Sequence, residues 1–237
     1  TLMPTLASAI ETLARQRLVE TSASFWTSAE LISIMDLGHK DLWRDTVDLK
    51  QEHYLTVNDS DVSLSASTST LTGVPSDVHK VYLIEPRDVS SDSANAGLIF
   101  TPLDFNHASV RMARTLDAAD PTNTNIYYSI TGQGGPVNAP TIRVAPQVTS
   151  QVLLTFTYVP TLTTLVSTAP ILIPGEADAA LIAWTVAFAL AKEREDKSPD
   201  PNWLAVYSTE KQHLMQSLGL RQYQEAQTAD AVFEQFW

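Results

Sequence analysis

Cysteine is absent from the 237 residues of the chain, which excludes disulfide bridges, cysteine-ligated metals and thiol catalysis. Basic residues are also few: 15 lysines and arginines stand against 27 aspartates and glutamates, a formal net charge of −12. The densest cationic stretch, KEREDK at 192–197, neutralises itself. Because an acidic surface repels phosphate, the composition excludes a sequence-specific reader of DNA.

Long apolar runs of the length that a membrane requires are missing too. Residues 179–191 contain a single polar residue, Thr185, but thirteen helical residues span only about 20 Å, less than the roughly 30 Å core of a bilayer. We therefore expect protein, rather than lipid, to cover this helix. The first twenty residues place no basic segment ahead of an apolar run, so we expect no secretion signal there.

The usual motifs of catalysis and metal binding are also lacking. The five histidines are scattered without an H-E-x-x-H pair, and no G-x-S-x-G elbow occurs. The stretch GQGG at 132–135 lacks the Lys-Ser/Thr of a phosphate loop, and NDSD at 58–61 lacks the Gly and distal Glu of a calcium loop, so we interpret both as turns. We expect no enzymatic activity, no cofactor and no metal.

Helical periodicity marks both ends of the chain. Near the start, one apolar face is formed by Leu6, Ile10, Leu13 and Ala14, with Ser8 and Glu11 spaced as a capping box. A second capping box, Thr27 and Glu30, opens another helix, which we expect Gly38 to bend or break.

Between these ends, the composition and alternation of residues 54–173 are typical of short strands. Runs such as YLTV, HKVYLIEP, IYYSIT and VLLTFTYVP alternate with turn-forming residues, which favours an antiparallel sandwich or barrel. The helical period returns after residue 174. Asp200 and Pro201 then stand in the order of a cap and a first helical position, and Gly219 follows the last apolar residue of this helix.

The sequence thus predicts an α+β protein in which an antiparallel β-sandwich or barrel-like domain is inserted between helices that pack together as a bundle. The expected parts are N-terminal helices over 1–53, the β-domain over 54–173, a helical hairpin over 174–220 and a C-terminal docking tail over 221–237.

The helix near 177–191 has two apolar stripes. One consists of Ala177, Leu181, Trp184, Phe188 and Ala191, and the other of Ile182, Val186 and Leu190. If the chain's own helices cover one stripe, a neighbouring copy would cover the other. The expected subunit interface therefore comprises Ile182, Val186, Leu190, Trp184 and Phe188. The alternative, which does not exclude the first, is a helix at the centre of the chain's own bundle.

Several stretches occur in a familiar order. They are ELISIMDLGHKDLWRD, LTGVPSDVHKVYLIEP, IYYSITG, TIRVAPQVTSQVLLTFTYVPTLTTL and ILIPGEADAALIAWTVAFALAKERED, the last being an Ile-Pro entry into an alanine-rich helix. In this order and spacing, over about 190 residues, the chain resembles the adaptor, or head-completion, proteins of tailed bacteriophages. Residues 86–125 depart from the family pattern, because they are longer and richer in serine and aspartate.

The resemblance implies a structural virion protein at the head–tail interface, assembled in the cytoplasm of the host bacterium. Family members form a ring, usually of twelve copies, with the portal protein above and a tail or neck protein below. Genomic double-stranded DNA passes through the ring without sequence-specific binding, and no membrane is involved. The family also tends to dock on the portal through chain termini.

The last five residues carry three large aromatic side chains, and we expect Phe233, Phe236 and Trp237 to anchor a portal-docking tail. The alternative is that they fold back on the chain's own helices. Two other functions stay open from the sequence: another neck or tail-tube component of the virion, and a β-sandwich module that binds carbohydrate or a receptor.

Overall fold

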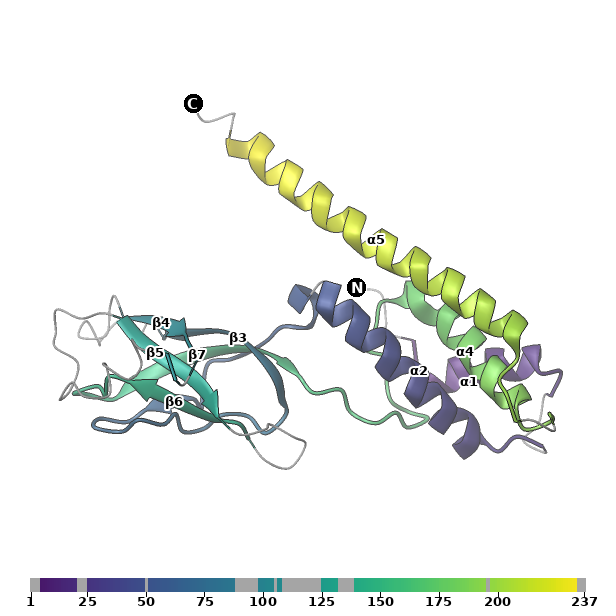
Figure 1. Cartoon of the computed structure of the whole chain (residues 1–237), viewed down its shortest axis with the longest axis horizontal. Helices are drawn as coiled ribbons and strands as arrows, with labels where there is room; N and C mark the ends of the chain where they lie inside the picture. The colour runs from purple at the N-terminus through teal and green to yellow at the C-terminus, as the bar shows by residue number, and fades with distance from the viewer. Residues whose placement is uncertain are drawn as a thin grey trace. The chain divides into compact units, whose positions relative to one another are not determined.

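The computed structural model describes residues 5–20, 25–49, 51–87, 98–104, 106–107, 125–131, 139–194 and 197–233, with the backbone alone for residue 51 and residues 220–233. The chain folds into two compact units (Figure 1). The helical unit comprises Thr1–His53 and Leu162–Trp237, and the β unit comprises Tyr54–Thr161. The protein is therefore of the α+β class, as predicted.

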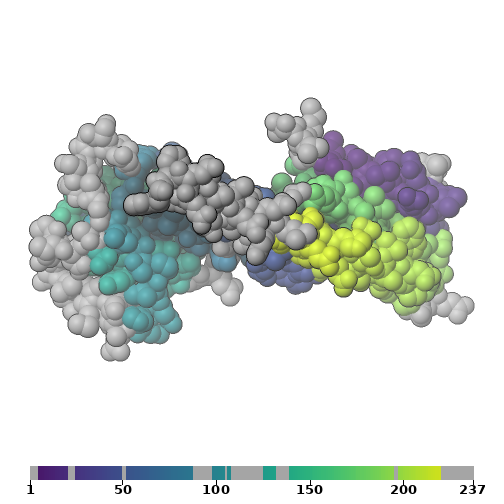
Figure 2. All heavy atoms as spheres, turned by 90° about the horizontal axis from the view of Figure 1, so that it is seen from above, coloured from purple at the N-terminus to yellow at the C-terminus, as the bar shows by residue number. Residues whose placement is uncertain are grey.

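The helical unit is arranged around one short apolar helix, α4. Its elements are α1 (Ala7–Arg17), α2 (Ser28–Leu49), the 3-10 turn η2 (Gly175–Ala177), α4 (Asp178–Leu190) and α5 (Pro201–Phe233), with a further 3-10 turn, η1 (Gln51–Tyr54), at the boundary to the β unit. α4 packs against α1, α2 and α5. In Figure 2, α4 (green) lies between α1 (purple) and α5 (yellow-green).

Two helix starts follow the predicted local signals. Thr27 accepts a hydrogen bond from the Glu30 backbone (3.2 Å), and the Glu30 carboxylate accepts one from the Thr27 backbone (2.8 Å), which confirms the capping box. The Asp200 carboxylate likewise accepts hydrogen bonds from the backbone of Asn202 (2.9 Å) and Trp203 (3.1 Å) at the start of α5.

Three expectations about the helices are wrong. α1 begins after Leu6 without a side-chain cap, because Glu11 binds Arg15 instead of completing a box with Ser8. α2 runs unbroken through Gly38, since Gly38 makes room for the indole of Trp184. α5 continues through Gly219 to Phe233: a helical glycine costs only about 1 kcal/mol, which the good helix formers around it offset.

The β unit is built around the nine-residue strand β7. Its strands are β1 (Thr56–Asn58), β2 (Ser63–Leu64), β3 (Val78–Pro86), β4 (Ile99–Pro102), β5 (Asn125–Thr131), β6 (Thr141–Ala145) and β7 (Val152–Pro160). β1 and β3 both pair antiparallel with residues 156–158 of β7, so they occupy its opposite edges, while β2 pairs with its start. The second sheet has the order β4-β5-β6.

One pairing corrects the antiparallel prediction, since β4 pairs with β5 in parallel. A parallel pair needs a crossover of a dozen or more residues, and the 22 residues from 103 to 124 that connect these strands are long enough. Residues 69–72 connect the two sheets, because they bond both to β2 of the first sheet and to β6 of the second. Thr72 exchanges backbone hydrogen bonds with Ser63 of β2, and the backbone of Leu71 donates to the carbonyl of Ile142 of β6. The result is a barrel-like closure.

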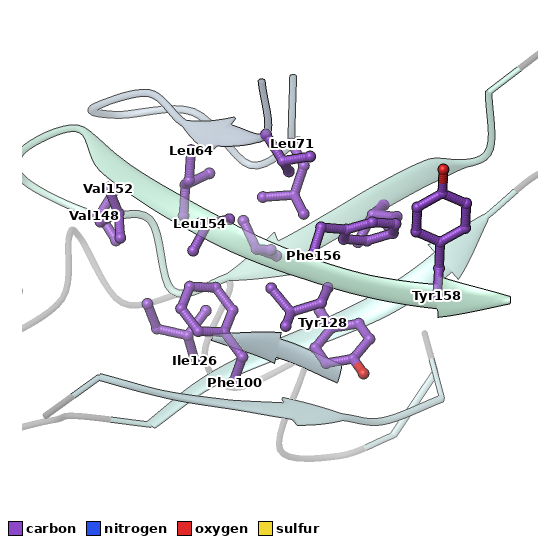
Figure 3. Packing of buried hydrophobic residues seen from close by; sticks show 14 of the residues in the cluster. Leu64, Leu71, Phe100, Ile126, Tyr128, Val148, Val152, Leu154, Phe156 and Tyr158 are labelled. Atoms are coloured by element: carbon purple, nitrogen blue, oxygen red, sulfur yellow. The ribbon is translucent and has the colours of Figure 1, made fainter. Parts of the chain in front are cut away.

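An apolar core fills the space between the two sheets (Figure 3). Leu154 and Phe156 point inward from β7, and they meet Ile126 and Tyr128 of β5 and Phe100 of β4. Phe156, Leu154 and Ile126 have almost no exposed area. Alternate residues of β7 therefore supply the centre of this core.

The β unit ends earlier than the sequence suggested. Residues 162–173, which the sequence placed in the β-domain, belong to the helical unit. Here they form an extended segment, the strap, whose backbone pairs with residues 5–8 through bonds such as Ala7 N–H to Ala169 O (3.1 Å) and Ile171 N–H to Thr5 O (2.8 Å). Strand-like residues in this stretch pair with the start of α1 rather than with a sheet.

Candidate interaction surface

The apolar character of α4 is explained largely by contacts inside the chain. Seven of its thirteen residues are buried: Ala180, Leu181, Ala183, Thr185, Val186, Ala187 and Ala189. The hydroxyl of Thr185 donates to the carbonyl of Leu181 one turn earlier (2.7 Å), so this polar group is satisfied within the helix. α4 is thus the central helix of the unit, which is the alternative that the sequence left open.

Two indole groups fix α4 against the α2 segment. The ring N–H of Trp26 donates to the carbonyl of Ala189 (2.9 Å), and that of Trp184 donates to the carbonyl of Ile34 (3.0 Å). The Trp184 ring lies so close to Gly38 that a Cβ there would come within 2.6 Å of it. Both tryptophans therefore pack as apolar groups while their N–H groups find buried acceptors.

A polar cluster joins α2 to α5. Asp41 accepts hydrogen bonds from Tyr207 (2.5 Å) and Lys211 (2.6 Å), and Lys211 also pairs with Asp45 (2.6 Å). Burial alone would raise the pKa of Asp41, but the hydrogen bonds from Lys211 and Tyr207 outweigh it and lower that pKa. Burial, reinforced by the bond to Asp41, raises the pKa of Tyr207. The cluster keeps Asp41 ionised and Tyr207 protonated at neutral pH.

Two buried side chains of α2 hold the strap. Asp36 accepts a hydrogen bond from the backbone of Leu165 (2.9 Å), and Nε2 of His39 accepts one from the backbone of Leu172 (3.3 Å). His39 is fully buried, and its Nδ1 has no hydrogen-bond partner among the described residues. Burial lowers the pKa of His39 to about 4, against the opposing charge of Asp36, so the imidazole is neutral at pH 7.

An open groove of about 520 Å³ lies between the start of α2 and the end of α4. Its lining consists of Trp26, Ala29, Glu30, Ser33, Ile34, Phe188, Ala189 and Lys192. Lys192 pairs with Glu30 at the rim (2.9 Å) and donates to the carbonyl of Phe25 (2.7 Å). Hydrogen bonds from the Thr27 backbone and from Lys192 lower the pKa of Glu30 to about 2. The groove is therefore apolar inside, and its two charges neutralise each other.

The predicted interface residues have different environments in the structure. Val186 has no exposed area, so none of its surface is accessible to a neighbouring copy. Ile182 and Leu190 are half-buried against the cluster that contains Val186 and Trp26. Trp184 and Phe188 are half-buried with their rings 4.4 Å apart, and Phe188 also lines the open groove.

The predicted docking residues lie at the edge of what the structure describes. Phe233 is the last residue of α5, with only its backbone described, and Phe236 and Trp237 lie outside the described residues.

The structure also divides the apolar face that the sequence assigned to α1. Ile10 and Ala14 are fully buried, whereas Leu6 and Leu13 are exposed. Leu6 and Leu13 are seven residues apart and so lie on nearly the same side of the helix, about 20° from each other. That spacing is visible in the sequence, but helical periodicity alone does not show which edge of an apolar stripe faces the core.

Neither a metal centre nor a membrane span is found in the part of the chain that the structure describes. Within it, no three histidine, aspartate or glutamate side chains gather as possible metal ligands. No described helix is both long enough and apolar enough to cross a bilayer.

Comparison with protein families decides what kind of protein this is. The model of the SU10 adaptor protein family matches residues 4–232, nearly the whole chain. The chain belongs to the SU10 adaptor family. No curated protein matches it in sequence. Membership makes this adaptor a structural phage protein and a virion component, in a family not known for enzymes, and it implies contact with portal and tail proteins.

Proposed function

We propose that this adaptor forms a closed ring of twelve copies below the portal, joins the head to the tail and continues the DNA channel. The observation that carries the proposal is the family match over residues 4–232. The net charge of −12 supports it, because a conduit for DNA should repel phosphate rather than hold it. Assembly takes place in the host cytoplasm, where head and tail parts meet.

The test is the oligomeric state of the adaptor with and without the portal. We expect a monomer when the adaptor is alone and a closed ring on the portal when both are mixed, measured by light scattering and by electron microscopy of the complex. Binding of the adaptor to tail-tube protein without binding to the portal would contradict the proposal. It would favour the function of another neck or tail component.

The C-terminal part of α5 is proposed to dock on the portal. α5 continues fifteen residues beyond its buried Leu218, about 22 Å of helix, and Figure 1 shows it running past the start of α4. This length supports a role as an arm that ends in Phe233, Phe236 and Trp237. Buried aromatic side chains often dominate the energy of an interface.

Deleting residues 229–237 should abolish co-purification with the portal if these aromatics are the anchor. A sharper variant replaces Phe233, Phe236 and Trp237 by alanine. Its matched control replaces Glu234 and Gln235, which lie between these aromatic residues, by alanine. Unchanged portal binding by the aromatic variant would show that another element docks, while leaving the ring itself untouched.

A further inference from the structure

The outward side of α1 carries an apolar strip and no exposed carboxylate. The single acidic residue of α1, Glu11, is buried against Arg15 (2.8 Å). This strip consists of Leu6, which directly precedes the helix, and of Ala9 and Leu13. The other exposed side chains of α1 are polar: Ser8, Thr12, Gln16 and Arg17.

This apolar surface continues onto the strap. Leu6 forms an antiparallel bridge with Pro170, and Leu172 follows two residues later on the same side, so both strap residues extend the apolar surface. Pro170 and Leu172 are exposed, like Leu6 itself. We name this surface the α1 face: Leu6, Ala9, Leu13, Pro170 and Leu172.

The open groove lies away from the α1 face. Arg15 donates a hydrogen bond to the carbonyl of Trp26, which lines the groove. Arg15 and Leu13 are two positions apart, which is about 200° around a helix, so Leu13 points away from the groove. Leu37, one turn after the groove residue Ser33 on α2, is 58% exposed. The helical unit thus has two different apolar surfaces that point in different directions.

Two different apolar surfaces that point in different directions fit a head-to-tail contact, in which one surface of each copy meets the other surface of the next. Charge also favours a second copy of the chain as the partner of these surfaces. Two copies that each carry −12 repel each other unless they meet where carboxylates are absent or neutralised. The α1 face has no carboxylate and is bordered by Arg17, while the groove has Glu30 neutralised by Lys192.

We propose that the α1 face of one copy docks into the groove between α2 and α4 of the next copy. This inference rests on the proposed ring and names its repeating contact. A standard protein interface buries about 800 Å² on each partner, with 20–30 residues a side. The α1 face has only five residues, so the contact is weak between free copies and closes when the portal holds the copies side by side.

The absence of cysteine from the adaptor sequence allows a direct test, because a cross-link between two adaptor copies must join introduced thiols. Leu13→Cys marks the α1 face and Ser33→Cys marks the groove. On the portal, a mixture of the two single variants treated with a short bismaleimide should give cross-linked dimers. Each variant alone should stay uncrosslinked, and the double variant should give a ladder of oligomers.

Val206→Cys is the matched control. Val206 is 42% exposed, against 43% for Leu13, and it lies on α5 in neither surface. It should give no cross-link with Ser33→Cys. A portal-bound ring in which Leu13→Cys links only to itself, or links to nothing, would overturn the proposed contact.

A charge variant separates this inference from the proposed function. Leu13→Glu should weaken ring formation on the portal about tenfold or more, because each contact would bury an unpaired carboxylate. Val206→Glu should leave ring formation unchanged, and the thermal midpoints of both free variants should match that of the wild type. If the wild type forms a ring and Leu13→Glu forms it equally well, only the docking inference fails. If the wild type forms no ring, both fail.

Discussion

The helical unit and the β unit are held together by different means. In the helical unit, single side chains bind backbone groups far away in the sequence: Trp26 reaches Ala189, Trp184 reaches Ile34, and His39 holds the strap at Leu172. In the β unit, strand pairing around β7 and one apolar cluster dominate. Tyr158 adds a side-chain bond to Asp77 (3.1 Å) at its edge.

The difference indicates how each unit should respond to change. A buried polar group that loses its partner costs the full penalty of its desolvation, so the helical unit should be sensitive to protonation and to the position of single rings. An apolar core responds to volume instead. All five tryptophans fall within the sequence ranges of the helical unit, whereas five of the seven tyrosines fall within those of the β unit. Fluorescence can therefore follow the two units separately.

The largest expected effect is in the core of the β unit. Phe156→Ala should destabilise that unit by about 3–5 kcal/mol, because it removes a fully buried ring and leaves a cavity. The tyrosine signal should unfold at lower denaturant while the tryptophan signal keeps its midpoint. A tryptophan midpoint that falls equally would contradict the idea of separately stabilised units.

The next effect concerns pH and the helical unit. His39 has a pKa near 4 in the fold against an ordinary value of 6.5, so unfolding takes up a proton between these pH values. The contribution of neutral His39 to the free energy of unfolding should therefore be complete above pH 6.5. As the pH is lowered toward 4, this contribution should fall by up to about 3 kcal/mol. Denaturant titrations followed by tryptophan fluorescence measure this slope.

His39→Gln is the control for that slope, because glutamine keeps an acceptor for the Leu172 backbone but does not titrate. Its stability should change less with pH over the same range. The acidic groups with lowered pKa, Glu30 and Asp41, are the same in both proteins, so they contribute equally to both slopes and leave the comparison intact. An identical slope in both proteins would exclude His39 as its source.

The smallest effects come from one substitution made at two helical glycines. Gly38→Ala should destabilise the helical unit by about 1–3 kcal/mol, since the new Cβ would lie 2.6 Å from a Trp184 ring that is fixed by its bond to Ile34. Gly219→Ala meets nothing within 4 Å and should stabilise α5 by about 0.5–1 kcal/mol. Thermal unfolding followed by circular dichroism should therefore shift in opposite directions, and a shift in the same direction would refute the assigned role of Gly38.

Signals confined to a few neighbouring residues could be predicted from the sequence. The box of Thr27 and Glu30 and the cap at Asp200 involve groups within four positions of each other, so composition and spacing suffice. The two-stripe pattern of α4 was also visible, but its meaning was not. Val186 proved to be core because α1 covers it, and no local pattern contains that information.

The sequence by itself determined the α+β class, the family and the chemistry that the chain lacks, because these depend on composition, periodicity and the order of segments. The tertiary structure alone decided which apolar residues stay exposed, that β4 and β5 run parallel, and that residues 162–173 join the helices. The physical reason is distance along the chain. Burial of Ala14 or Phe188 depends on neighbours more than a hundred residues away, and only folding brings those neighbours together.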